Sequence, residues 1–333
     1  MEGRNTVSNK IEVSVYCLAY NHEPIIRKCL DGIVMQKTNF RYEVIVHDDA
    51  STDNTASIIK EYAERFPDII KPIYQTENQY SRGVKIVTTY IFPKCQGKYL
   101  AVCEGDDFWT DENKLQKQYD MMERNKDIVL CVHRAKQINL KTGVESLYPQ
   151  AQRAEGYVSV EEAIFLGGGY FPTCSFFYRY PFKMLPNAHG YVTGDYLTIV
   201  SAAVYGKVYF MDECMATKTF LLPSSWAYRH QKDVSAYIRH LQELKLWMDE
   251  IDRSTDGCYV ASIELRKLKL DFEIDRANDK YRNLLSEKYK PILRKLPIET
   301  QIATRVRAYF PKTCCLLKQT VVWLKSRKGG NRL

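Results

Sequence analysis

Residues 98–107 read KYLAVCEGDD, and this stretch decides what kind of sheet the chain builds. Its apolar run predicts a buried strand, and three carboxylates follow at the end of that strand, on Glu104, Asp106 and Asp107. Carboxylates this close repel one another, so we expect a cation between them. Hard oxygen ligands favour Mg²⁺ or Mn²⁺. The alternative is an ordinary acidic turn before a helix, with Asp111 as a further cap.

Outward from this stretch, strand and helix patterns alternate. Short apolar runs predict strands and amphipathic stripes predict helices. Strands are expected at Ile11–Ala19, Tyr42–His47, Ile69–Tyr74, Lys98–Cys103, Ile128–His133, Thr173–Tyr178 and Val208–Phe210. Helices are expected from Pro24, from Asp53 or Asn54, over Val84–Phe92, around Leu115 to Met122, and from Asp195 to about Tyr205. The alternation predicts an α/β fold with a mainly parallel sheet flanked by helices.

Ligands of such sheets bind beyond the carboxyl ends of the strands. Tyr20 follows the first expected strand and Asp49 follows the second. A carboxylate at the position of Asp49 can accept hydrogen bonds from a base N–H or a ribose hydroxyl. The neighbouring residues 51–55 are interpreted as turn and cap residues. Asp195 follows Gly194 and is either an ordinary helix cap or a general base.

Several common nucleotide and hydrolase motifs are absent from the sequence. The first strand is followed by AYNHEP rather than a G-x-G-x-x-G turn, which argues against a dinucleotide oxidoreductase. There is no Walker A motif and no G-x-S-x-G elbow. Gly167-Gly168-Gly169 lacks the Lys-Ser/Thr of a phosphate loop, so it is interpreted as a turn.

These segments, in this order, resemble family-2 glycosyltransferases of the GT-A fold. The matching stretches are VSVYCLAYN (residues 13–21), CLDGI (29–33), YEVIVHDDASTDNT (42–55) and GKYLAVCEGDD (97–107). The resemblance is dense from about residue 11 to 125 and thinner to about 225. EGDD followed by Phe108-Trp109 looks like bacterial enzymes that build surface polysaccharides.

The resemblance implies a role for each residue of the candidate site. Tyr20 would pack on the nucleotide base and Asp49 would hydrogen-bond it. Glu104 and Asp106 occupy the positions of the family's D-x-D motif, where the first acid usually faces ribose. Asp106 and Asp107 rank above Glu104 as metal ligands, because Glu replaces the more common Asp there. Asp195 matches the position of the family's catalytic base.

The implied activity is metal-dependent transfer of a sugar, with inversion, from a nucleotide sugar to an acceptor hydroxyl. UDP is the expected nucleotide, and the acceptor is a saccharide or a lipid-linked saccharide. One departure concerns the Tyr-Arg-x-His stretch that closes over the diphosphate in many relatives. Here the corresponding stretch is KTFL (218–221) followed by SSW (224–226), so Lys218 or Arg229 would have to substitute. The alternative function is a non-catalytic nucleotide-sugar-binding or assembly protein on the same fold.

Charge is distributed unevenly along the 333 residues. Residues 288–333 contain twelve Lys or Arg and one acid, a net charge of +11, whereas the whole chain carries +8. We therefore expect a catalytic domain over residues 1–230 and a helical C-terminal region over 231–333 with a basic, amphipathic tail. The stretch from Ala303 to Leu324, interrupted at Pro311, predicts helices that lie on an anionic membrane surface or pack on the catalytic domain. Nucleic acid is not an expected partner.

Ten cysteines occur without a C-x-x-C pair, and most lie in apolar runs. Such cysteines usually behave as small buried hydrophobic residues in a reducing compartment. The first ten residues are polar, so no signal peptide is expected. The predicted location is the cytoplasm, peripheral to the inner face of the cell membrane.

Overall fold

The computed structural model describes residues 10–140, 142–149, 153–187, 190, 194–220 and 233–310. The chain divides into two compact units, residues 1–232 and 233–333. The assignment of catalysis to residues 1–230 and of a tail function to 231–333 stays a prediction.

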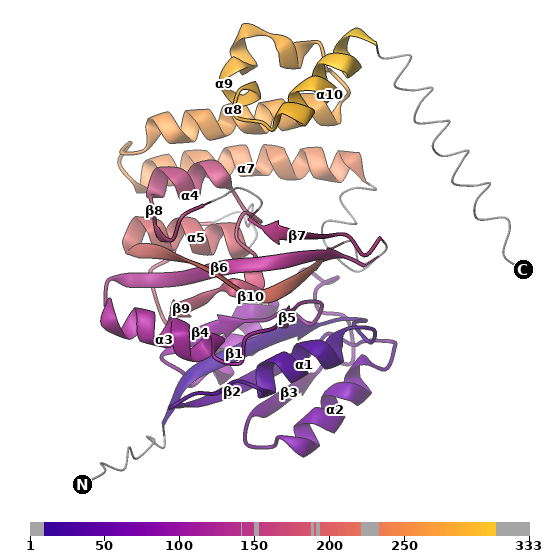
Figure 1. Ribbon diagram of the computed structural model, residues 1–333, viewed down its shortest axis with the longest axis vertical. Coiled ribbons are helices and arrows are strands. Elements are labelled where there is room, and N and C mark those ends of the chain that lie inside the picture. The colour runs from indigo at the N-terminus through magenta and orange to yellow at the C-terminus, as the bar shows by residue number, and fades with distance from the viewer. Residues whose placement is uncertain are drawn as a thin grey trace, which may run out of the picture. The chain divides into compact units, whose positions relative to one another are not determined.

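The first unit is built on one ten-stranded sheet with helices packed against it (Figure 1). Its strands are β1 (Ile11–Ala19), β2 (Arg41–Asp48), β3 (Ile70–Tyr74), β4 (Tyr99–Val102), β5 (Phe108–Trp109), β6 (Ile128–Asn139), β7 (Glu145–Tyr148), β8 (Gly156–Val158), β9 (Phe177–Arg179) and β10 (Lys207–Phe220). Its α-helices are α1 (Ile26–Val34), α2 (Thr55–Arg65), α3 (Lys114–Arg124), α4 (Val160–Leu166) and α5 (Gly194–Tyr205).

The strand order is β3-β2-β1-β4-β9-β6-β10-β5, with β7 added beside β6 and β8 beside β10. The longest ladders, β6 with β10 and β1 with β2, are parallel, and the short strands β5, β7, β8 and β9 pair antiparallel. The predicted α/β class with a mainly parallel sheet is therefore confirmed. The chain order reverses between β1 and β4, which is where a ligand crevice forms in sheets of this kind.

Helices α1 and α2 lie side by side against the strands of the N-terminal half (Figure 1). Helix α1 buries Ile26, Cys29, Leu30 and Ile33, which recur at helical spacing in the sequence. This burial attaches the helix to the sheet, so the turn before it is held at the carboxyl end of β1.

A buried polar network fixes β4 beside β1. The Ser14 hydroxyl donates to Glu43 Oε1 at 2.7 Å and accepts from the Gly97 amide at 2.8 Å. The Gln96 amide also donates to Glu43 Oε1, at 2.8 Å. A Cβ on Gly97 would come within 2.4 Å of the Ser14 nitrogen, so only glycine permits this approach. The network sets the register of β4 and therefore the position of the acidic residues that follow it.

Two predicted segments differ from the structure in the C-terminal half of the sheet. Thr173–Tyr178 is not one strand, because Thr173–Ser175 forms a 3₁₀ turn and the strand is Phe177–Arg179. The Ser175 amide and hydroxyl both bond to the Pro172 carbonyl, at 2.9 and 2.7 Å, and this closes the turn. The short strand predicted at Val208–Phe210 is the first part of β10, which has 14 residues.

The helix predicted over Val84–Phe92 is also different. The structure has a π-helical turn at Val87–Ile91 and a 3₁₀ turn at Phe92–Lys94. Pro93 lacks an amide hydrogen and cannot continue an α-helical ladder, which explains why the segment tightens and ends there.

Among the described cysteines, five are buried as expected: Cys17, Cys29, Cys103, Cys131 and Cys174. The sulfurs of Cys17 and Cys29 are 3.8 Å apart, and those of Cys29 and Cys103 are 3.7 Å apart. They pack in the apolar core beneath the end of β4, and the neighbouring thiols, together with burial, keep the pKa of Cys29 well above its ordinary value.

The second unit is helical. It contains α7 (Val234–Ser254), α8 (Val260–Ala277), α9 (Lys290–Leu293) and α10 (Ile298–Tyr309). Helix α7 buries Leu241, Leu244, Trp247, Met248 and Ile251, which recur at helical spacing. Helix α8 buries Ile263, Leu270 and Phe272 among its buried residues.

Helix α10 begins before the predicted Ala303 and includes only the first part of the predicted tail. Residues 311–324, the rest of that prediction, lie outside the described residues. In the described ranges no helix combines the length and hydrophobicity needed to cross a bilayer.

Candidate functional site

Three carboxylates meet at the carboxyl end of β4, as the sequence predicts. One oxygen from each of Glu104, Asp106 and Asp107 lies within 4.8 Å of the others. Strand β10 holds the acid loop, residues 104–107, through Thr219. The Thr219 amide donates to Asp107 Oδ1 at 2.9 Å, and the Thr219 hydroxyl donates to the Asp106 carbonyl at 2.5 Å. The arrangement offers clustered hard oxygens that suit a divalent cation.

The electrostatics of this acid loop follow from burial and crowding. Burial, with Asp106 beside it, raises the pKa of Glu104 to about 7. Burial and the charge of Asp106 also raise the pKa of Asp107 well above its ordinary value. The Lys218 ammonium opposes both increases. A second positive charge would relieve the same repulsion, which supports the cation predicted from the sequence.

His22 is a further residue at this loop, and the sequence interpretation gave it no role. Its side chain is 9% exposed and its Nδ1 has no hydrogen-bond partner. A Cβ on Gly105 would lie 2.7 Å from that nitrogen, so the imidazole rests on the glycine of the acid loop. Burial lowers the pKa of His22 despite the nearby Asp106, and this keeps the ring neutral at pH 7.

Tyr20 lies just beyond β1 with 37% of its surface exposed. Its neighbour Asn21 adopts a left-handed conformation (φ 55°), as does Ala50 in the next loop (φ 60°). The Asn21 amide donates to Ser51 Oγ at 3.0 Å, and the Thr52 amide donates to Asn21 Oδ1 at 2.8 Å. Residues interpreted as turn and cap formers therefore join the loop after β1 to the loop after β2. A left-handed backbone at residues other than glycine, as at Asn21 and Ala50, is common at functional sites.

Asp49 follows β2, and both of its carboxylate oxygens are bound by the chain itself. Oδ1 accepts from the Gln79 amide at 2.8 Å and Oδ2 from the Tyr80 amide at 3.0 Å. The side chain is buried, so these charge-assisted bonds fix the loop that contains Gln79 and Tyr80. Recognition of a base by Asp49 stays a prediction, and any such bond would use the remaining lone pairs of the two oxygens.

Asp195 lies in the first turn of α5, where the helix dipole favours a negative charge. Its Oδ2 accepts from the Gly169 amide at 2.7 Å and its Oδ1 from the Tyr196 amide at 2.8 Å. A Cβ on Gly168 would come within 3.1 Å of the Tyr196 side chain. The glycine run interpreted as a simple turn therefore orients Asp195. The charge of Asp195 contributes to the raised pKa of Glu104, after burial and Asp106, so the two acids are near each other.

Lys218 and Tyr148 complete the cluster. Lys218 lies on β10 next to Thr219, and its ammonium is 5.6 Å from the centroid of the Tyr148 ring. Burial raises the pKa of the Tyr148 hydroxyl, Lys218 lowers it and Asp195 raises it. Lys218 is therefore near the acid loop, and Tyr148 is near Asp195. Lys218 was expected only as a replacement in the closing stretch, of which residues 221, 224–226 and 229 lie outside the described residues.

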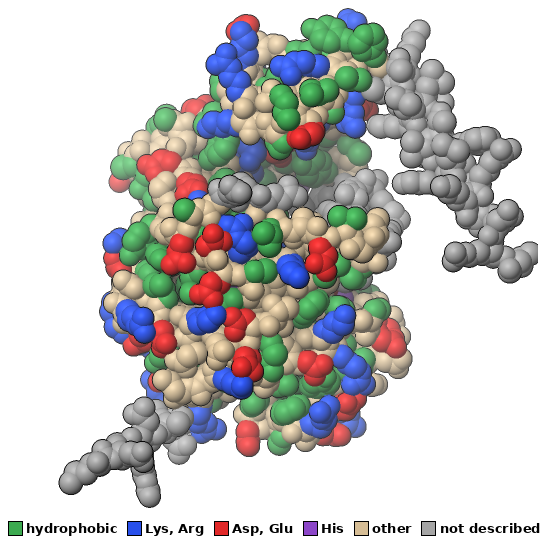
Figure 2. Space-filling view, viewed as in Figure 1, with side chains coloured by type: hydrophobic (Ala, Val, Ile, Leu, Met, Phe, Trp, Pro, Cys, Tyr) green, Lys and Arg blue, Asp and Glu red, His purple; other side chains and the backbone are tan. Residues whose placement is uncertain are grey.

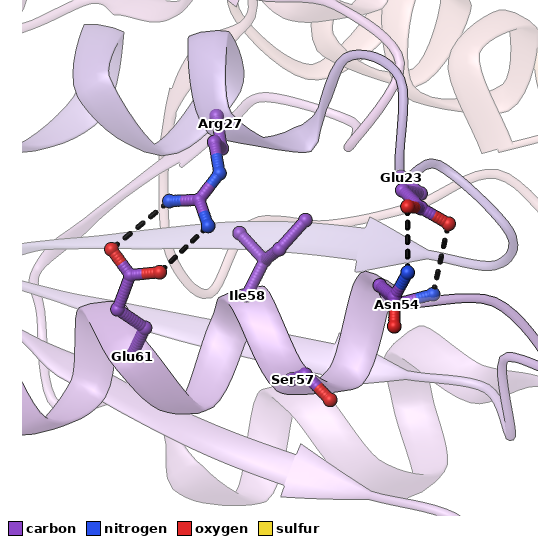
Figure 3. A pocket seen from close by; sticks show the side chains of 6 residues that line it. All are labelled: Glu23, Arg27, Asn54, Ser57, Ile58 and Glu61. Atoms are coloured by element: carbon purple, nitrogen blue, oxygen red, sulfur yellow. Dashed lines mark hydrogen bonds and ion pairs between the residues drawn. The ribbon is translucent and has the colours of Figure 1, made fainter.

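A separate hollow is lined by residues of α1, α2 and the turns before them (Figure 3). Arg27 forms a two-fold ion pair with Glu61 at 3.0 and 2.7 Å, and Glu23 accepts two bonds from Asn54. Four of the lining residues are thus paired with each other, and the acid loop contributes nothing to the lining. The acid loop at the carboxyl end of β4 lies outside this hollow.

Comparison with known proteins identifies the domain. The family model described as "Glycosyl transferase family 2" matches residues 14–183, which is just over half of the chain. The putative teichuronic acid biosynthesis glycosyltransferase TuaG of Bacillus subtilis is 33% identical over 114 residues, or 34% of this chain and 43% of TuaG. The chain thus spans less than half the length of the curated relatives it matches.

Solved structures show the same fold. S. aureus TarS 1–349 in complex with UDP-GlcNAc superposes with a TM-score of 0.58 at 17% identity, covering 84% of this chain and 78% of that one. The mannosyltransferase PcManGT of Pyrobaculum calidifontis, in complex with GDP-Man and Mn²⁺, gives a TM-score of 0.55 at 16% identity, covering 92% and 90%.

Proposed function

The chain belongs to glycosyl transferase family 2 and has the GT-A fold, and on this premise we propose that it transfers a sugar from a nucleoside-diphosphate sugar to an acceptor hydroxyl. One observation carries the proposal. The acid loop and Asp195 come from segments about 90 residues apart, yet Asp195 is close enough to raise the pKa of Glu104. A cation site for the donor and a base for the acceptor would therefore lie near each other.

The acid loop fits a divalent metal ion, Mn²⁺ or Mg²⁺. Its donors are carboxylate oxygens within 4.8 Å of one another, and their raised pKa values reflect an excess of negative charge. Asp106 and Asp107 would hold the ion. A bound divalent cation would neutralise the diphosphate of the donor. The Mn²⁺ in the PcManGT complex supports the same assignment.

Asp195 is suited to accept the proton of the acceptor hydroxyl. Two backbone amides hold its carboxylate, which fixes its orientation. The acceptor oxygen then forms a bond to the anomeric carbon while the bond from that carbon to the diphosphate breaks. With Glu104, Asp106 and Asp107 assigned to the donor and the cation, Asp195 as the one base is consistent with a single displacement and inversion of configuration.

The donor end of the site is assigned by the same reasoning. Tyr20 is exposed at the end of β1 and can pack on the base, Asp49 would hydrogen-bond the base, and Glu104 would face the ribose. The UDP-GlcNAc in the TarS complex supports UDP as the nucleotide. TuaG, which is named for teichuronic acid biosynthesis, supports a role in bacterial surface-polysaccharide synthesis.

Helix α10 supports a lipid-linked acceptor at an anionic membrane surface. Ile298, Ile302 and Val306 follow one another at four-residue spacing and are 59%, 53% and 41% exposed. Tyr309 and Phe310 extend this apolar face. Hydrophobic and basic side chains lie together on the C-terminal unit (Figure 2). An apolar stripe with basic neighbours is typical of helices that lie in a membrane interface.

The transfer proposal is tested by donor hydrolysis. The protein is incubated with a panel of UDP-, GDP- and dTDP-sugars, with Mn²⁺ or with chelator, and released nucleoside diphosphate is measured. We expect slow, metal-dependent release from one donor, and a loss of about 10²-fold or more in Asp195→Asn. Binding without any release by the wild-type protein would favour the non-catalytic alternative.

The membrane proposal needs its own experiment. Co-sedimentation with vesicles containing anionic phospholipid is compared with neutral vesicles at low salt. Ile302→Glu should lower the bound fraction, whereas Ser57→Glu on α2 serves as a surface control that should not. Equal recovery with both vesicle types would contradict the membrane assignment.

A further inference from the structure

Tyr148 is a partly exposed side chain near Asp195 whose hydroxyl has no partner in the fold. It is the last residue of β7. Its ring lies 5.6 Å from the Lys218 ammonium, a contact that uses the ring and not the hydroxyl. In the part of the chain that the structure describes, the Tyr148 hydroxyl forms no hydrogen bond. Its donor and its acceptor lone pairs are therefore available to a ligand.

The Tyr148 hydroxyl lies next to the loop that orients Asp195. A Cβ on Gly169 would be 3.6 Å from the Tyr148 hydroxyl oxygen, and the Gly169 amide donates to Asp195 Oδ2 at 2.7 Å. With ordinary backbone geometry, the Tyr148 hydroxyl oxygen and Asp195 Oδ2 are therefore at most about 9 Å apart. A single sugar residue with a hydrogen bond at each end can span this distance.

The sheet holds Tyr148 in a fixed position. Tyr148 lies opposite Ala135 in the antiparallel ladder of β6 and β7. The neighbouring Arg134 of β6 is buried, and its guanidinium donates to the Pro149 carbonyl at 3.1 Å. The ladder and this bond together tie the backbone at Tyr148 to β6. A side chain on a fixed backbone loses little conformational freedom when a ligand binds, which favours specific recognition.

The position of Tyr148 indicates the acceptor rather than the donor. The residues assigned to the donor, Tyr20, Asp49 and Glu104, follow β1, β2 and β4. Tyr148 instead belongs to β7, which pairs with β6, and it lies near Asp195, the proposed base. Burial raises the pKa of the Tyr148 hydroxyl, and the charge of Asp195 adds to this rise, so the group is a neutral donor at pH 7. A neutral donor of this kind suits a ligand with many hydroxyl groups, such as a saccharide.

We propose that the Tyr148 hydroxyl donates a hydrogen bond to a hydroxyl group of the acceptor saccharide, beside the hydroxyl group that Asp195 deprotonates. The inference rests on the proposed function and names a residue that selects the acceptor. Because the sugar is held at this second point, it presents one particular hydroxyl group to Asp195. A saccharide without the group that Tyr148 binds loses this hydrogen bond and is a poorer acceptor.

The test uses octyl glycosides as acceptors, with the sugar nucleotide from which the wild-type protein releases nucleoside diphosphate. Octyl glycosides of glucose, galactose, mannose, N-acetylglucosamine and N-acetylgalactosamine are screened for transfer, and monodeoxy forms of the best acceptor are then compared. With wild type, one monodeoxy form that keeps the accepting hydroxyl group should lower kcat/KM by about 3- to 10-fold, the size of a hydrogen bond between neutral groups. Tyr148→Phe should show a similar loss with the complete glycoside and no further loss with that monodeoxy form.

The variant and its control differ only in where a hydroxyl is removed. Tyr148→Phe keeps the ring that contacts the Lys218 ammonium, so we expect it to fold. Tyr157→Phe is the matched control, because Tyr157 is an exposed tyrosine on β8, and it should behave like wild type with every acceptor.

Three results would overturn the inference and leave the proposed function intact, provided that the wild-type protein still releases nucleoside diphosphate. The first is transfer to none of the octyl glycosides. The second is equal kcat/KM of wild type and Tyr148→Phe with all of them. The third is the same loss in Tyr148→Phe with every monodeoxy form, since Tyr148 would then bind no particular hydroxyl group. Absence of nucleoside diphosphate release from the wild-type protein would overturn both.

Discussion

Replacing Asp106 by Asn should stabilise the metal-free protein and at the same time abolish its response to metal. At an effective dielectric constant of about 20, two unit charges 4.8 Å apart repel by about 3.5 kcal/mol. The rise in the pKa of Glu104 from 4.5 to about 7 corresponds to about 3.4 kcal/mol, and burial rather than Asp106 is its larger cause. Asp106→Asn should therefore gain about 1–2 kcal/mol in chelator.

The assay is thermal unfolding at pH 8 in chelator and in Mn²⁺. In chelator the variant should unfold about 2–8 °C above wild type. Mn²⁺ at 100 times its dissociation constant should stabilise wild type by about 2.7 kcal/mol and should leave Asp106→Asn unchanged. Asp68→Asn, at an exposed site, is the control and should follow wild type in both conditions.

The pH dependence of the stability provides an independent check on the direction of the effect of Asp106→Asn. Because the native pKa of Glu104 lies above its unfolded value, the native protein holds more protons between pH 4.5 and 7, and its stability falls as pH rises through that window. Removing the Asp106 charge reduces this fall. The advantage of Asp106→Asn in chelator should thus widen from pH 5 to 8. An equal Mn²⁺ shift in both proteins, or a variant less stable in chelator, would refute the assignment.

Further predictions concern Asp195, Asp49 and Lys114. Asp195→Asn should keep donor affinity within a few-fold, because the Asn oxygen can still accept from the Gly169 amide, and should lower the transfer rate by about 10²-fold or more, because the base is lost. Normal turnover in steady-state kinetics would leave Asp195 as a structural residue. Asp49→Ala leaves two backbone amides without their acceptor, so urea unfolding should show a loss of about 2–4 kcal/mol, with faster hydrogen exchange at Gln79 and Tyr80; protection equal to wild type would contradict this. Burial lowers the pKa of Lys114 to about 8, so the unfolded chain binds more protons than the native protein between pH 8 and 10.5. The free energy of unfolding of wild type should therefore rise by up to about 3 kcal/mol relative to Lys114→Met across that window; parallel stability curves would show that Lys114 is not buried as a charge.

The sequence predicted the N-terminal half of the sheet and the acid loop because the signals there are local. An apolar run followed by Glu104, Asp106 and Asp107 is visible within ten residues, and the spacing of Cys29, Leu30 and Ile33 is visible within one helix. Parallel strands bring their carboxyl ends to one edge, so topology alone placed these carboxylates at the candidate site.

The rest depended on contacts between distant segments. Asp212 and Glu213 interrupt the apolar pattern of β10, yet the strand continues because it pairs with β6 over most of its length and because these acids pair with Arg134 and Lys117. Seventy residues separate Tyr148 from Lys218, and only the register of both strands against β6 brings them together. The hydrogen bond from the Gly169 amide to Asp195 likewise joins distant segments, so the sequence of the glycine run predicted only a turn.

The bond between Asp107 and Thr219 also has a consequence for how such proteins diversify. It joins the two ends of a chain segment of more than 100 residues, so the segment begins and ends at the acid loop. A segment with adjacent ends can be lengthened, shortened or exchanged with little disturbance to its host, provided that β9 still pairs with β4 and β6 with β10. Recombination within this segment that retains Asp195 would therefore leave the acid loop in place. Chimaeras that exchange the stretches between its strands are a route to finding which of them contact the acceptor.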